Sequence, residues 1–166
     1  PFAVVDQGPH HRLREYATCA DARGPVALLV PPLMITSEVY DIDAELSAVA
    51  ALGRLGVRPF VVDFGAPENE AGGFTRTLDD HVIAAADSLE RVRALTGRAV
   101  HLCGYSQGGM FAYQTAAFVR SEGVASVMWF DGIECVATVK WRVPDSCHWL
   151  RRKTSLEVTS TSPSLS

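Results

Sequence analysis

Ser106 is the residue whose neighbours in this sequence most clearly suggest chemistry. It stands between two glycines, in the stretch Gly104-Tyr105-Ser106-Gln107-Gly108. Apolar residues lead into this stretch and a helix-like apolar pattern follows it, so the serine falls on a sharp turn between a strand and a helix. A serine lifted above the carboxyl edge of a sheet becomes a nucleophile when a base takes its proton. The alternative is a small residue that only fits a tight turn.

Attack by Ser106 on an acyl carbonyl would also need two hydrogen-bond donors for the oxyanion. The first predicted donor is the backbone N–H of Gln107, at the positive end of the following helix. The second should lie in the loop after the first strand, where Pro31 and Pro32 have no N–H to offer. Leu33 or Met34 comes next and is the candidate. The alternative is a rigid loop that only ends the strand.

The base and the acid that would orient it are less clearly marked. His148 is the sole histidine after Ser106, and Asp131 and Asp145 are the aspartates there. Asp131 follows an apolar strand and is a candidate acid, although it could instead cap a turn with the next glycine. His148 is a candidate base, but it lies three residues from Asp145 with no strand between them.

The other histidines and the cysteines favour structural roles. His81 falls in the first turn of a helix, and His101 lies inside the strand before Ser106, where it suits a hydrogen-bonded core residue. His10 and His11 are adjacent but lack a third ligand at useful spacing, so we predict a surface loop and no metal. The four cysteines show no C-x-x-C spacing, which favours reduced thiols and a cytoplasmic location.

The elements that must position Ser106 alternate along the chain. Short apolar runs predict buried strands, and longer segments with helical periodicity predict the helices between them. The predicted strands are 26–30, 57–64, 98–103 and 124–130, and the helices begin near 41–43, 78 and 107 and end near 55, 97 and 122. Ile42 and Leu46 fall at the apolar spacing of the first helix, and Thr77-Leu78-Asp79-Asp80 is typical of a capping box at the start of the second. This alternation predicts an α/β fold, a parallel sheet with helices on both faces.

We divide the chain into three parts. Residues 1–24 are expected to be an irregular lead-in, 25–131 the α/β core, and 132–166 an atypical, poorly ordered tail with a serine-rich end. Within the first part, residues 9–16 could instead form an edge strand, and within the last part residues 137–143 could form a strand.

The core resembles the α/β-hydrolase superfamily, and within it the branch similar to poly(3-hydroxyalkanoate) synthases. The resemblance covers about residues 25 to 130 and rests on four stretches: Val30-Pro31-Pro32, Asp63-Phe64-Gly65-Ala66-Pro67, Thr77-Leu78-Asp79-Asp80-His81-Val82 and Gly104-Tyr105-Ser106-Gln107-Gly108-Gly109. The chain also looks like the lipase-like half of actinobacterial proteins that join such a domain to an acyl-CoA synthetase.

The resemblance implies a partial α/β-hydrolase fold and acyl chemistry. Polyester synthases carry cysteine where this chain has Ser106, which moves the expectation toward a lipase, esterase or thioesterase acting on acyl esters or acyl-CoA. A polyester-synthase-like acyltransferase is the alternative, and a catalytically incomplete piece is the third reading. The superfamily places its acid and histidine after the nucleophile, and the resemblance stops near Phe130. We therefore hypothesise a truncated chain, with a synthetase domain as a fusion partner of the parent protein.

Composition excludes other classes of function. The net charge of −4 and pI near 5.7 argue against nucleic acid as a partner. No apolar run is long enough to predict a transmembrane segment. No phosphate-binding glycine loop follows a strand, so we expect no nucleotide cofactor.

Overall fold

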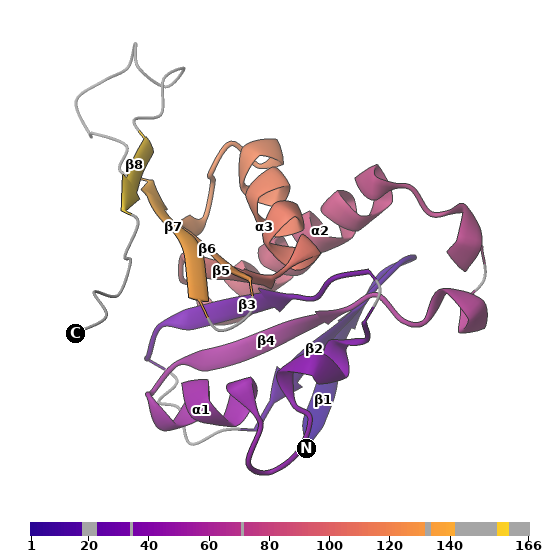
Figure 1. The fold of residues 1–166 in the computed structure, drawn as a ribbon, viewed down its shortest axis with the longest axis horizontal. Helices are drawn as coiled ribbons and strands as arrows, with labels where there is room; N and C mark the ends of the chain where they lie inside the picture. Colours follow the sequence, from indigo (N-terminus) through magenta and orange to yellow (C-terminus); the bar gives the residue numbers. More distant parts are fainter. Residues whose placement is uncertain (18–22, 34, 71, 132–133, 142–155, 160–166) are drawn as a thin grey trace.

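The sheet that carries Ser106 has eight strands in the described part of the chain. The computed structural model describes residues 1–17, 23–33, 35–70, 72–131, 134–141 and 156–159. The strands follow the order β1-β2-β4-β3-β5-β6-β7-β8 across the sheet, and the four central ones, β4, β3, β5 and β6, run parallel (Figure 1). Their bounds are β1 Phe2–Gln7, β2 Arg12–Tyr16, β3 Val26–Val30, β4 Arg58–Asp63, β5 Val100–Tyr105, β6 Val124–Asp131, β7 Glu134–Trp141 and β8 Leu156–Thr159.

Helices lie on both faces of this sheet, which confirms the predicted α/β class. The helices α2 (Leu78–Thr96) and α3 (Gln107–Phe118) lie on one side, and α1 (Ala48–Arg54) lies on the other (Figure 1). Three 3-10 turns, η1 (Ser37–Tyr40), η2 (Pro67–Asn69) and η3 (Gly73–Thr75), occupy the connections. No helix among the described residues is long and apolar enough to cross a membrane.

The central strand β3 shows why a continuous apolar run correctly predicts a strand buried on both faces of the sheet. All five of its residues are buried, because successive side chains point to opposite faces and both faces are covered. Val26, Leu28 and Val30 join the core beneath α2 and α3. Ala27 and Leu29 join the smaller core on the α1 side.

The first helix begins later than its apolar spacing predicts. The Oδ1 atom of Asp43 accepts the N–H groups of Glu45 at 2.8 Å and Leu46 at 2.7 Å. This local bonding competes with a helix, so α1 starts only after Ser47, whose side chain caps it. Ile42 and Leu46, predicted to face the core, are 63% and 64% exposed.

The other two helices follow their sequence signals more closely. The predicted capping box at the start of α2 is present, since Thr77 accepts the N–H of Asp80 and the Asp80 carboxylate accepts the N–H of Thr77. Gly97 ends α2 in the left-handed region. Helix α3 ends at Phe118 rather than near 122, because Arg120 and Ser121 both adopt positive φ.

The first part of the chain is more regular than an irregular lead-in. Residues 2–16 form a hairpin in which β2 pairs antiparallel with β4. Of the two alternatives for residues 9–16 the strand is therefore present, although β1 and not β2 forms the edge. The buried carboxylate of Asp63, at the end of β4, accepts bonds from Arg12 at 3.1 Å and from Arg14 at 3.0 Å. Burial would raise the pKa of Asp63, but the Gly65 N–H and the two guanidinium groups together hold this pKa below its usual value. These charged contacts across 50 residues of sequence leave no local periodicity to detect.

The last part of the chain adds two strands to the sheet, and the first of them overlaps the strand considered for residues 137–143. The backbone of β7 pairs antiparallel with β6, and β8 pairs antiparallel with β7. The rest of the predicted tail, residues 132–133, 142–155 and 160–166, lies outside the described residues.

Candidate active site

Ser106 occupies a strained turn between β5 and α3. Its backbone has φ 51° and ψ −122°, a region that residues with a Cβ rarely adopt and that costs about 1–3 kcal/mol. Two backbone hydrogen bonds hold it there. The Ser106 N–H donates to the Phe130 carbonyl at 2.6 Å, and the Ser106 carbonyl accepts the Gly109 N–H at 3.0 Å. The turn is therefore fixed from the neighbouring strand β6 and from the first turn of α3.

The glycines around Ser106 are required by close packing. A Cβ on Gly104 would lie 2.2 Å from the backbone of Gly108, and a Cβ on Gly108 would lie 2.0 Å from the Val30 carbonyl oxygen. A Cβ on Gly109 would lie 2.1 Å from the Trp129 ring. The backbone of β5 thus contacts the backbone of α3, and α3 contacts the end of β3. These contacts place the loop after β3 beside the turn at Ser106.

The two segments predicted to supply oxyanion donors lie side by side. The Leu33 N–H donates to the Oε1 atom of Gln107 at 3.1 Å. Gln107 is the first residue of α3, where backbone N–H groups have no partner within the helix. The Leu33 donor is bonded to the Gln107 side chain, so a substrate oxygen would have to displace that side chain to reach it. Met34, the other candidate, lies outside the described residues.

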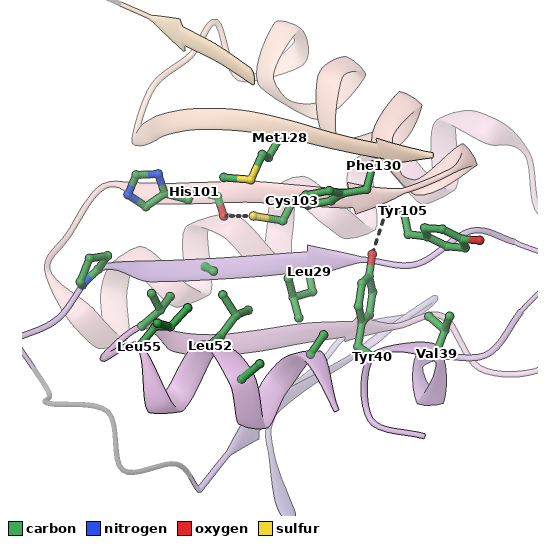
Figure 2. A pocket seen from close by; sticks show the side chains of 15 residues that line it. Leu29, Val39, Tyr40, Leu52, Leu55, His101, Cys103, Tyr105, Met128 and Phe130 are labelled. Carbon is green, nitrogen blue, oxygen red and sulfur yellow. Dashed lines mark hydrogen bonds between the residues drawn. The ribbon is translucent and has the colours of Figure 1, made fainter. Parts of the chain in front are cut away.

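Tyr40 also takes part in this arrangement, and sequence reasoning missed it. It ends η1 and is only 7% exposed. Its hydroxyl donates to the Val30 carbonyl at 2.7 Å. It also accepts the Tyr105 N–H at 3.0 Å (Figure 2). Burial raises the pKa of this hydroxyl far above its usual value, so it stays protonated at neutral pH. No motif marks such a residue in one sequence, because its partners are backbone groups 10 and 65 residues away.

His81 and His101 both have structural contacts, as predicted. The Nδ1 atom of His81 lies 2.6 Å from the Thr77 carbonyl, and the ring is stacked on Phe111. Burial lowers the pKa of His81. The Nδ1 atom of His101 lies 2.7 Å from the Ser126 hydroxyl.

The predicted acid and base are only partly within the described part. Asp131 ends β6, directly after Phe130, whose carbonyl binds the Ser106 N–H. The backbone of Asp131 therefore lies beside the turn, while its side chain lies outside what the structure describes. His148 lies outside the described residues altogether.

The histidine pair near the start of the chain lies in the loop between β1 and β2, as predicted, but one of its side chains is not at the surface. His11 is only 5% exposed. Neither of its ring nitrogens has a hydrogen-bond partner. Its pKa is lowered by burial, although the nearby Asp87 and Asp6 act in the opposite direction. Among the described residues, no group of histidine, cysteine and acidic side chains is arranged to hold a metal ion.

An apolar groove of about 660 Å³ runs along the sheet on the α1 side. It extends from Pro25 and Val57, where the parallel strands begin, to Tyr105 and Phe130, where they end beside Ser106. Figure 2 shows Leu52 of α1 and Leu55, the residue that follows this helix, on one side of it and Met128 and Phe130 of β6 on the other. The floor includes Leu29 and Cys103.

Comparison with known proteins gives matches at the level of structure. No family model and no curated protein matches this sequence. A putative α/β hydrolase of unknown function from Agrobacterium tumefaciens matches with a TM-score of 0.53 and 19% identity, over 71% of this chain and 55% of that one. A lidless α/β serine hydrolase from Xanthomonas campestris matches with a TM-score of 0.53 and 21% identity, over 72% and 56%.

A third match is the mature lipase BlEst2 from Bacillus licheniformis, with a TM-score of 0.51 and 19% identity, over 66% of this chain and 41% of that one. The chain thus spans about half the length of the solved structures it matches. The parallel sheet, the helices on both faces and the turn at Ser106 together give this chain part of the α/β-hydrolase fold.

Proposed function

We propose that this chain carries the nucleophile and oxyanion donors of a serine hydrolase that cleaves acyl esters or thioesters. The observation that supports this most directly is the backbone of Ser106, held at φ 51° between β5 and α3 by bonds to Phe130 and Gly109. Glycine would adopt the backbone conformation of this turn with less strain than serine. The presence of a serine side chain therefore argues for a use of its hydroxyl.

The proposed reaction begins with attack of the Ser106 Oγ atom on the acyl carbonyl carbon. The Ser106 proton passes to a base, for which His148 is the candidate. The carbonyl oxygen becomes an oxyanion and takes hydrogen bonds from the N–H groups of Gln107 and Leu33, once the Gln107 side chain has moved off Leu33. The tetrahedral intermediate then collapses to an acyl-enzyme on Ser106 and expels the alcohol or thiol, which takes the proton from the base. Water later hydrolyses the acyl-enzyme and releases the acid.

The substrate class follows from the resemblance to acyl-transferring and lipolytic enzymes and from the apolar groove that ends at Tyr105 and Phe130. An acyl ester or acyl-CoA fits this setting. A parent protein that also holds an acyl-CoA synthetase domain would supply such a thioester.

The test is covalent labelling by a fluorophosphonate, which reacts with activated serines. We expect the wild-type chain to be labelled and Ser106→Ala to remain unlabelled. His148→Ala should lower the labelling rate by roughly 10³-fold or more, since removing a triad base removes most of the rate. A folded wild-type chain that takes no label would refute the proposal and favour a catalytically incomplete α/β protein.

A further inference from the structure

The hydroxyl of Tyr40 occupies the point at which β3 and β5 separate. The two strands pair in parallel as far as Val30 and Gly104. Beyond that, one chain enters Pro31-Pro32 and the other enters the turn at Ser106. The Val30 carbonyl and the Tyr105 N–H then need another partner, and a phenol hydroxyl can both donate and accept. Tyr40 does both, at 2.7 Å and 3.0 Å.

The two groups that Tyr40 binds belong to the two segments that carry the oxyanion donors. Tyr105 immediately precedes Ser106, and Val30 lies three residues before Leu33. The Val30 carbonyl is also the atom against which Gly108 packs, at the start of α3. One buried hydroxyl therefore sets the spacing between the turn and the loop after β3.

From these contacts we infer that Tyr40 is a positioning residue for the reaction proposed above, on which the inference rests. It does not touch the substrate. Its hydroxyl holds the backbone of Tyr105 and Val30 so that the N–H groups of Gln107 and Leu33 stay at the separation that an oxyanion requires. Such donors are effective only when they are fixed before the charge develops.

The competing explanation is that Tyr40 only fills space. Its ring does line the apolar groove, together with Leu29 and Val39 (Figure 2). Phenylalanine would fill that space equally well and lacks only the hydroxyl. Tyr40→Phe thus separates the two explanations. Tyr16→Phe is the matched control, because Tyr16 is 5% exposed and belongs to the same small core as Tyr40. It ends β2, which β4 separates from β3, and its hydroxyl interacts with Arg14 of its own strand.

The experiment compares the full chain with both variants by two measurements. Amide hydrogen exchange, resolved by NMR, reports on the Tyr105 N–H, with the Leu102 N–H in the middle of β5 as the internal reference. The fluorophosphonate labelling rate of folded protein reports on the site. We expect Tyr40→Phe to speed exchange at Tyr105 relative to Leu102 by about tenfold, the size of one lost hydrogen bond, and to slow labelling by a similar factor. Tyr16→Phe should change neither ratio.

Each result decides a separate question. Unchanged exchange at Tyr105 in Tyr40→Phe would overturn the inference, as would normal labelling despite faster exchange. Exchange that speeds up equally at Tyr105 and Leu102 in Tyr40→Phe would show a general loosening of the protein and no local role for the hydroxyl, which also overturns the inference. A wild-type chain that takes no label refutes the proposed function itself, and the exchange ratio then still shows whether the hydroxyl joins the two segments.

Discussion

The strain at Ser106 predicts that removing its Cβ stabilises the protein. At φ 51° and ψ −122°, a residue with a Cβ carries about 1–3 kcal/mol of strain, and glycine carries almost none. Glycine adds about 0.5–1 kcal/mol of chain entropy to the unfolded state, which opposes part of this gain. Ser106→Gly should therefore exceed Ser106→Ala in its free energy of unfolding by about 1 kcal/mol. Both variants lose the hydroxyl, so the difference isolates the Cβ.

The measurement is urea unfolding followed by tryptophan fluorescence, with thermal unfolding as a second readout. A difference of about 1 kcal/mol corresponds to a shift of roughly 2–4 °C in Tm for a chain of this size. Ala94→Gly is the control, since it replaces alanine by glycine at an exposed, unstrained site in α2. Its free energy of unfolding should fall by about 1 kcal/mol. If Ser106→Gly is less stable than Ser106→Ala by a similar amount, the serine is not strained and this reasoning is wrong.

Three further predictions test the packing around the site. Gly108→Ala should lower the free energy of unfolding by about 3 kcal/mol, because its Cβ meets the Val30 carbonyl oxygen. The Cβ of Gly97→Ala meets nothing within 4 Å, so this variant should lose only about 1–2 kcal/mol, for its positive φ. Urea unfolding compares the two variants. Burial lowers the pKa of His81 in the folded chain, so the unfolded chain binds more protons than the folded chain below about pH 6.5. The free energy of unfolding should therefore fall as the pH drops through that value. His81→Phe should flatten this dependence in unfolding measured from about pH 7.5 to 5. Thr77→Ala removes the cap of α2 and should lower the free energy of unfolding by about 1 kcal/mol at neutral pH; a change under 0.3 kcal/mol would contradict the cap.

The features that the sequence predicted well are those with local causes. The apolar runs of β3 and β4, the Thr77–Asp80 capping box and the turn at Ser106 each depend on residues within a few positions of one another. The two segments predicted to supply oxyanion donors could also be placed beside each other, since parallel strands bring their carboxyl ends to one edge of the sheet.

The features that it missed depend on distant partners. The hairpin of residues 2–16 is anchored by Arg12 and Arg14 on Asp63, about 50 residues away. Tyr40 binds backbone groups, so no side-chain pattern reveals it. The late start of α1 is a different case, because Asp43 offers a local competitor to helical bonding that the apolar spacing of Ile42 and Leu46 conceals.

The contacts of the glycines beside Ser106 bear on how such a motif persists through evolution. Gly104, Gly108 and Gly109 are held by steric contact with backbone and with Trp129, and none of these contacts involves the serine hydroxyl. Selection for a stable fold would therefore retain all three in a descendant that had lost the serine. Finding these glycines in a sequence identifies the turn, and only the hydroxyl at the residue between them reports on the chemistry.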